Sequence, residues 1–122
     1  MFNSLHLLGL VDGDAQYIEL AKGGPLLSFT LAVPRPVPMI GGPVEDRIPV
    51  IAQGTLAESL REDIRDGRQI IVEGSIRERQ GSKEDSENGR IYVRASIVRP
   101  TDETIKRDWL RDLASISHEQ TV

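Results

Sequence analysis

The sequence predicts a small, mostly β fold: a five-stranded barrel with one helix between strands 3 and 4 and an appended C-terminal helix. The 122 residues suffice for one domain, and 39% of them are hydrophobic, which is enough for a core. Several short runs alternate apolar and polar residues between turn signals, as half-buried strands do. A single internal segment instead repeats its apolar residues every four positions, as a helix does.

The first strand signal is Leu5–Val11, which ends at the turn-prone Asp12–Asp14. Gly9 inside this run indicates a bulge or a sharp bend. A weaker run covers residues 16–20. The clearest alternation covers Leu27–Val33 and predicts a half-buried strand.

A long loop then interrupts the third strand. Residues 34–43 contain four prolines and two glycines, which are incompatible with a helix or a fully paired strand. Strand character resumes at residues 48–52, where Pro49 removes one backbone donor and indicates an edge or a bulge. The loop, with Arg35 at its base, is a candidate clasp for a nucleic-acid strand or a partner. Its apolar residues Val37, Met39 and Ile40 favour a protein or subunit contact over a passive connector.

The predicted helix begins at residue 55. Thr55 and Glu58 have the spacing of a capping box, and Gly67 stands where a C-terminal glycine cap is expected. The resulting helix has about three turns, near the average for globular proteins. One apolar stripe follows it at spacing four: Leu56, Leu60 and Ile64.

Two further strands follow, at residues 70–79 and 91–99, and Pro100 is expected to end the second. The apolar face of the second strand is expected to consist of Ile91, Val93, Ala95 and Ile97. Residues 101–116 predict an amphipathic helix and residues 117–122 a frayed tail, so the barrel domain covers residues 1–100. The helix carries one apolar stripe, which suits docking on its own barrel or, alternatively, binding of a partner; the candidate partner-binding residues are Ile105, Trp109 and Leu113.

Composition excludes several classes of protein. There is no cysteine, and the two histidines lie near opposite ends of the chain, so neither a thiol site nor a metal site is expected. No signature of a catalytic triad or a phosphate loop occurs, so we expect neither an enzyme nor a cofactor. No apolar run approaches the roughly 18–20 residues of a membrane span, and no secretory signal is visible, which predicts a cytoplasmic protein.

The order of strands and helix is the pattern of the OB barrel. Three blocks also resemble bacterial single-stranded DNA-binding proteins. The opening strand, residues 3–9, and the alternating strand, residues 27–33, are similar to two of that family's strands. The most specific block is Gly-Thr-Leu-Ala-Glu at residues 54–58 together with Val-Glu-Gly-Ser-Ile-Arg at residues 72–77. The resemblance implies an OB fold, a homo-oligomer (dimer or tetramer) and binding of single-stranded DNA.

The sequence departs from that family at the positions where its aromatic residues stack on bases. Gln53 stands where the family has an aromatic residue before the glycine, and Gln80–Gly81 replaces a tryptophan. Aromatic residues make up only 4% of the chain, and the net charge is −4. Because stacking contributes on the order of 1–3 kcal/mol per base, binding is expected to be weaker and more dependent on salt than in the relatives.

The candidate nucleic-acid site is a set of cations with one ring. Arg77, Arg79 and Arg94 are expected on the face opposite the apolar one, where they would follow phosphates. Tyr92 on that face is a candidate for stacking on a base. Two further cations complete the candidate site: Arg47 and Lys83.

Two interpretations remain open at this point. The first is a protein of the replication or repair type that binds single-stranded nucleic acid independently of sequence, with DNA favoured over RNA. The resemblance is also compatible with a dimeric OB-fold protein of the primosomal replication protein N type. The second is an OB-fold protein-interaction module that has lost nucleic-acid binding, which the missing aromatic residues and the acidic total favour. In that case the mixed charges of the hairpin keep an exposed strand edge solvated and so protect it from aggregation.

Overall fold

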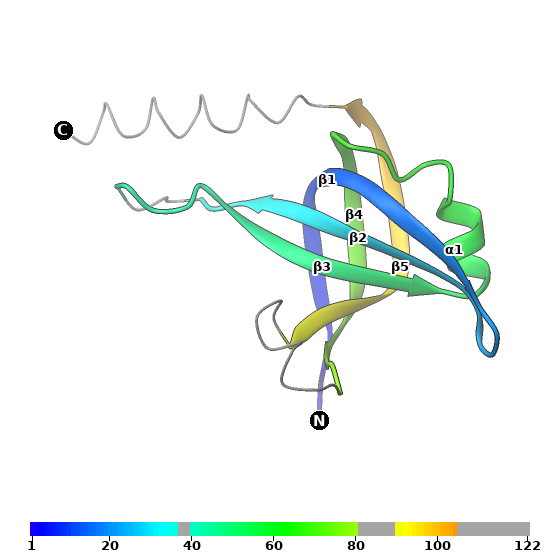
Figure 1. Cartoon of the computed structure of the whole chain (residues 1–122). Helices are drawn as coiled ribbons and strands as arrows, with labels where there is room; N and C mark the ends of the chain where they lie inside the picture. Colours follow the sequence, from blue (N-terminus) through cyan, green and yellow to red (C-terminus); the bar gives the residue numbers. More distant parts are fainter. Residues whose placement is uncertain (37–39, 81–89, 105–122) are drawn as a thin grey trace.

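The computed structural model describes residues 1–36, 40–80 and 90–104 (Figure 1). In this part of the chain the strands close into a barrel in the order β1-β2-β3-β5-β4. The helix lies between β3 and β4, so the predicted architecture of the barrel is confirmed. The elements in chain order are β1 (Leu5–Leu20), β2 (Gly24–Pro34), β3 (Glu45–Gln53), α1 (Thr55–Leu60), β4 (Arg68–Glu78) and β5 (Ile91–Thr104).

β1 is one long strand where the sequence predicts two runs separated by a turn. Its first part pairs with β4 and its second part pairs with β2, with a register shift between Asp12 and Gln16. The backbone N–H of Gly13 donates to the Asp66 carboxylate at 2.7 Å, which holds the bulge. A bulge bends a strand and increases its twist, so β1 can pair with β4 along its first part and with β2 along its second part. The predicted turn at Asp12–Asp14 is therefore wrong.

The number of strands is nevertheless five, because the segments on either side of the proline-rich loop are two strands, β2 and β3, rather than one broken strand. They pair with each other over nine positions, whereas β3 pairs with β5 only at Val50 and Ile51. The first half of β3 therefore has an open edge, as Pro49 indicated. Gly9 lies where β1 passes from β4 to β2, and a Cβ there would lie 2.5 Å from the carbonyl oxygen of Ala32. The missing side chain permits this close crossing.

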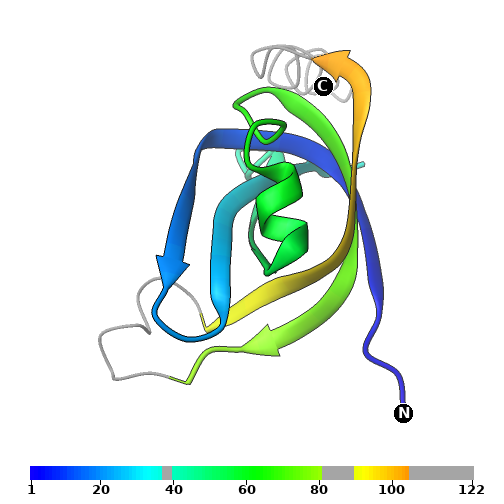
Figure 2. The same ribbon diagram turned by 90° about the vertical axis from the view of Figure 1, so that its right-hand side faces the viewer.

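Helix α1 is shorter than predicted and begins differently. Gly54, with φ of 67°, precedes it, and no side chain caps it, so the capping-box prediction is wrong. The N–H of Gly54 donates to Pro25 at 2.8 Å and its carbonyl accepts from Glu58 at 3.1 Å, so the glycine backbone starts the helix. Figure 2 shows α1 lying across one end of the barrel. Leu60 and Ile64 are buried there, so most of the predicted stripe does face the core.

The core fills the barrel with branched aliphatic side chains and one ring. β3 and β4 bury alternate residues, and β2 does so from Leu27 to Leu31, which is the pattern that period-two alternation predicts. β1 instead buries Gly9, Leu10 and Val11 in succession. Phe29 is 4% exposed, as expected for a core residue. The largest side chains with almost no exposure are Val11, Leu27, Leu31, Val50, Ile70 and Val72.

β5 departs from the prediction at both its middle and its end. Val98 is buried and Ile97 is 39% exposed, because the pairing with β4 shifts register between Glu73 and Gly74. The strand also continues through Pro100 to Thr104, and Thr101 donates to the carbonyl oxygen of Gln69 at 3.3 Å. Pro100 therefore does not end the strand, and the predicted helix does not begin at residue 101. The rest of that helix, with Ile105, Trp109 and Leu113, and the tail at 117–122 lie outside the described residues.

Candidate nucleic-acid interface

The outward face of the β2–β3 pair runs past two open pockets. Residues directly opposite each other on this face are Leu26 and Gln53, Ser28 and Ile51, and Thr30 and Pro49. All six are half-buried, so the face is neither solvated throughout nor part of the core. One pocket adjoins the Leu26 end of this face, and the other pocket adjoins the Thr30 end.

The first pocket, called here the hairpin pocket, lies between the β2–β3 pair and the β4–β5 hairpin. Its volume is about 480 Å³, within the roughly 300–1,000 Å³ typical of small-ligand pockets. Its lining combines apolar walls, amide groups, a ring and charges of both signs. The lining residues are Leu26, Ile51, Gln53, Arg77, Glu78, Arg79, Gln80 and Tyr92.

The hairpin pocket unites three of the predicted site residues. Arg77 lies directly opposite Tyr92 in the β4–β5 pairing, so both share one face. The Arg79 guanidinium lies 5.7 Å from the centre of the Tyr92 ring, in the range of a cation–π contact. The Arg77 Nε donates to the Ser75 hydroxyl at 3.3 Å, and its side chain remains exposed. A ring and two guanidinium groups together suit a base and its phosphates.

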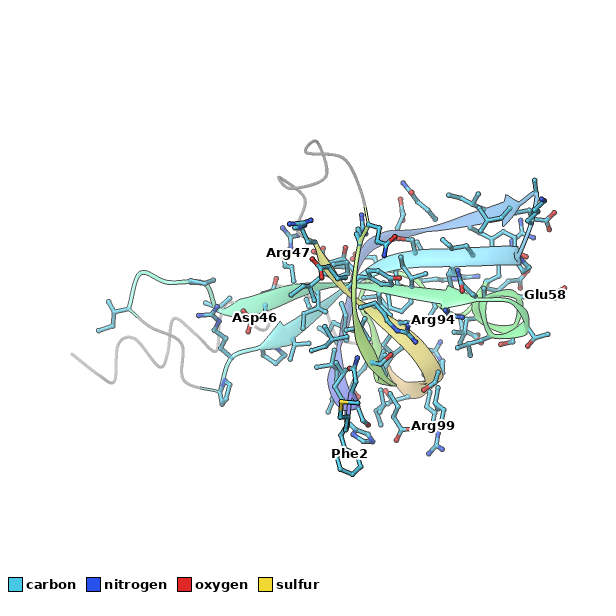
Figure 3. The ribbon with its side chains drawn as sticks, turned by 90° about the horizontal axis from the view of Figure 1, so that it is seen from below. Phe2, Asp46, Arg47, Glu58, Arg94 and Arg99 are labelled. Atoms are coloured by element: carbon cyan, nitrogen blue, oxygen red, sulfur yellow. The ribbon has the colours of Figure 1, made fainter. Side chains whose placement is uncertain are left out.

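Arg94 shares that face without lining the pocket. It is exposed and lies opposite Ser75, two positions along the strand from Tyr92. Figure 3 shows Arg94 and Arg47 apart from each other, and Arg94 lies beside Ile51 in the β3–β5 pairing, four positions along β3 from Arg47. The predicted cations therefore form no single cluster. Lys83, the remaining candidate, lies outside the described residues.

Arg47 belongs to the second pocket, called here the Asp12 pocket, which Asp12, Thr30, Arg47 and Pro49 line. The Arg47 Nε donates to the Asp12 carboxylate at 2.6 Å, and a second guanidinium nitrogen forms an ion pair with the same oxygen. The Asp12 side chain is only 11% exposed, whereas that of Arg47 is 62% exposed. Arg47 thus lies on the outward face of β2 and β3, but the Asp12 carboxylate already neutralises its charge.

Sequence reasoning missed two acidic members of these pockets. Glu78 is among the residues that line the hairpin pocket, although it lies opposite Ile91 in the β4–β5 pairing, on the face away from Arg77 and Tyr92. The contact between Asp12 and Arg47 joins residues 35 positions apart, and no local signal in the sequence reveals it. Gln53 is different, because its place in the pocket is where the family resemblance expects an aromatic residue.

A further ion pair fixes the base of the proline-rich loop. Two nitrogens of the Arg35 guanidinium donate to one Asp46 oxygen, at 3.0 and 2.7 Å. This hydrogen bonding, with the attraction of the charges, raises the pKa of Arg35 above its ordinary value. The N–H of Arg35 also donates to the carbonyl oxygen of Val44 at 2.9 Å. Arg35 therefore closes the loop rather than standing free as a ligand contact.

A second surface lies on the outer side of β1, β4 and β5. Leu8 lies opposite Ile71, and Ile97 lies opposite Glu73 one row away. Leu8, Ile71 and Ile97 are 52%, 37% and 39% exposed, and they form what is called here the apolar face. His6 Nε2 lies 3.0 Å from the Glu73 carboxylate beside them.

Comparison with known proteins identifies the family. Residues 2–100 match the model of the Single-strand binding protein family. The chain belongs to this family. A single-stranded DNA-binding protein of Aquifex aeolicus is 28% identical over 102 residues, which cover 81% of this chain and 69% of that protein. Single-stranded DNA-binding protein 1 of Chlorobaculum tepidum is 29% identical over 99 residues, covering 79% and 60%. The Thermotoga maritima single-stranded DNA-binding protein is 34% identical over 83 residues, covering 65% and 58%.

The fold of this family member is also that of a solved structure. A chain from the Plasmodium falciparum SSB complex with ssDNA superposes with a TM-score of 0.69 at 18% identity, covering 84% of this chain and 96% of that one. The family consists of binding proteins rather than enzymes, so this chain is not an enzyme. Among the described residues, no helix is long and apolar enough to span a membrane, and no group of three potential ligands is placed to hold a metal ion.

Proposed function

We propose that this family member binds single-stranded DNA along the outward face of β2 and β3 and the base of the β4–β5 hairpin. The observation that carries the proposal is the hairpin pocket, where Arg77, Arg79 and Tyr92 meet beside the apolar Leu26 and Ile51. Guanidinium groups neutralise phosphates, and the ring with the apolar wall accepts a base face. Arg94 extends the same face by two residues, and Arg47 and Lys83 are further contacts in this proposal.

Most of the affinity does not depend on the base sequence of the DNA. The affinity is lower than in relatives that stack several aromatic side chains on bases. Among the described residues only Tyr92 brings a ring to either pocket. Each missing platform removes on the order of 1–3 kcal/mol, so phosphate contacts carry a larger share of the affinity. We place the protein in replication or repair of DNA in the cytoplasm, where single strands are exposed.

Fluorescence anisotropy with a labelled oligonucleotide of about 30 nucleotides tests this function. Affinity should fall steeply between roughly 50 and 200 mM salt, because binding releases counterions. A variant with Arg77, Arg79 and Arg94 all changed to Ala should lose most of the binding. The matched control changes Arg61, Arg65 and Arg99 and should bind nearly as the wild type does. Arg61 is the C-cap of α1, Arg65 lies in the segment after it, and Arg99 lies opposite Ile71 on β5.

The second candidate, a protein-interaction module without nucleic-acid binding, is the alternative outcome of the same titration. It is favoured by the neutralisation of Arg47 by Asp12, which weakens the attraction of this arginine for phosphate. Absence of binding at both salt concentrations, or equal binding by the triple variant, would exclude the nucleic-acid site and leave this candidate.

The protein also associates with itself in this proposal, as a dimer or tetramer. The apolar face supports this, because three large aliphatic side chains of neighbouring strands stand partly exposed there. Burying apolar area at about 25 cal/mol per Å² stabilises such a contact. The stripe of Ile105, Trp109 and Leu113 remains a second candidate partner surface, outside the described residues.

Sedimentation velocity tests the self-association. Ile71→Glu should lower the mass toward that of a monomer, because a carboxylate in a buried contact is costly. Ile76→Glu is the matched control, since Ile76 is 49% exposed on the same strand but outside the apolar face. A monomeric wild type, or an Ile71→Glu variant of unchanged mass, would overturn this part of the proposal.

A further inference from the structure

The end of the β1–β2 pair exposes two aliphatic side chains beside the hairpin pocket. Ile18 and Leu20 on β1 are 47% and 40% exposed. Ile18 lies directly opposite Leu26 on β2, and Leu26 lies opposite Gln53, the last residue of β3. Leu26 and Gln53 also line the hairpin pocket. One cross-strand row therefore leads from the pocket to an exposed aliphatic side chain on β1.

Alternation along the two strands places this row on the outward surface. Leu27, the neighbour of Leu26, is 1% exposed and belongs to the core. Tyr17, the neighbour of Ile18, lies opposite Leu27, and its ring centre is 4.2 Å from the Arg61 guanidinium at the end of α1. Because neighbours in a strand point to opposite faces, Ile18 and Leu26 both point away from the core and from α1.

We propose that single-stranded DNA leaving the hairpin pocket passes over β1, where Ile18 and Leu20 form an aliphatic subsite for a base. This inference rests on the proposed function and extends the same path onto a third strand. Side chains directly opposite each other on neighbouring strands have Cβ atoms about 5 Å apart, so one base can contact both Ile18 and Leu26. The contact needs no ring in the protein, because the base itself supplies a flat surface that gains by leaving water.

Continuity with the hairpin pocket and the distribution of charge favour DNA as the occupant of this surface. Glu19, which alternates with Ile18, points to the other face of β1. An exposed cation, Lys22, lies in the turn two residues beyond Leu20. The next cross-strand row offers an amide, a hydroxyl and a guanidinium group, which are common phosphate contacts. Its members in strand order are Gln16, Ser28, Ile51 and Arg94.

Ile18→Trp tests the subsite by adding a ring on the path of the strand. Affinity for oligo-dT of about 30 nucleotides should rise about fivefold in anisotropy titrations, because bases stack on an indole. The salt slope should stay the same, since no charge is added. DNA should also quench the added tryptophan fluorescence, measured against the wild type with its single tryptophan.

Ile76→Trp is the matched control for the added ring. Ile76 is 49% exposed, close to the value for Ile18. It lies opposite the buried Val93 in the β4–β5 pairing, on the face away from Arg77 and Tyr92. A ring at position 76 therefore lies off the proposed path, and this variant should show neither the gain in affinity nor the quenching.

Ile18→Ser tests the same contact by removal. Affinity for the same oligonucleotide should fall about threefold, because apolar contact area is lost. Sedimentation velocity of this variant without DNA should give the mass of the wild type, because DNA rather than a second copy covers Ile18. A lower mass with unchanged affinity for DNA would assign Ile18 to a subunit contact and overturn the inference.

The outcomes separate this inference from the proposed function. Wild-type binding without a gain or quenching in Ile18→Trp overturns the subsite and leaves the proposed function intact. Equal gains in Ile18→Trp and Ile76→Trp overturn the subsite as well, since the position of the ring would not matter. Absence of binding by the wild type overturns the proposed function and the subsite together. A gain and quenching confined to Ile18→Trp, with a loss in Ile18→Ser, support the inference.

Discussion

The two pockets on the β2–β3 face contain arginines in opposite electrostatic situations. In the hairpin pocket, Arg79 lies against a neutral ring and the side-chain partner of Arg77 is a hydroxyl. In the Asp12 pocket, Arg47 is held by a largely buried carboxylate. An arginine attracts phosphate in proportion to the charge its surroundings leave unbalanced. The hairpin pocket is therefore the stronger phosphate site, although both pockets are similar in size and lie on one face.

Removing both arginines of the hairpin pocket should have the largest effect. Changing Arg77 and Arg79 to Ala is expected to lower affinity for single-stranded DNA about 30-fold at low salt. The slope of log affinity against log salt should fall by about 1.4, because roughly 0.7 is lost for each phosphate contact to a single strand. Anisotropy titrations at several salt concentrations measure both values. An unchanged slope would mean that these guanidinium groups contact no phosphate.

The ring should matter next, and in a different way. Tyr92→Leu keeps an apolar side chain but removes the stacking surface, so affinity should fall about tenfold. The salt slope should stay the same, because no charge is lost. Tyr17→Leu is the matched control, since the Tyr17 ring contacts Arg61, at 4.2 Å, and lines neither pocket. Equal losses in both variants would show that Tyr92 acts through folding rather than stacking.

The contrast between the pockets also shows how far the sequence predicts this molecule. Alternation predicts the strand faces well, because the side-chain period of a strand is fixed at two. It places Arg77, Arg94 and Tyr92 on one face, as the β4–β5 pairing confirms, and the contact of Arg79 with the Tyr92 ring puts Arg79 beside them. Alternation fails where register shifts: Ile97 is exposed and Val98 is buried beyond the shift at Glu73 and Gly74.

Other features depend on contacts between distant residues, which no local pattern contains. The Asp12–Asp14 segment has turn chemistry, but its hydrogen bond to Asp66 makes it a bulge in a continuous strand. A glycine backbone starts α1, in place of the predicted Thr55 side-chain cap. The pairing of Arg47 with Asp12 likewise arises only when β1, β2 and β3 assemble. The candidate cations were thus predictable, whereas their availability to a ligand was not.

The Asp12 pocket offers the reverse experiment, in which a substitution strengthens binding. Asp12→Asn removes the charge that neutralises Arg47, and affinity for single-stranded DNA should rise about threefold. The melting temperature should fall at the same time, because a largely buried charge-assisted hydrogen bond is weakened. Asp63→Asn is the control, since Asp63 is exposed in the turn after α1. A rise of equal size in both variants would indicate only the effect of net charge.

Removing Arg47 alone should have the smallest effect in the wild type, less than about twofold, because its charge is already paired. The same change in the Asp12→Asn background should abolish the gain, so the two substitutions form a double-mutant cycle. A coupling equal to the gain means that Asp12 acts by occupying Arg47. Independent effects would mean that Asp12 repels DNA directly and that Arg47 lies off its path. Anisotropy titrations of the four proteins at one salt concentration distinguish these cases.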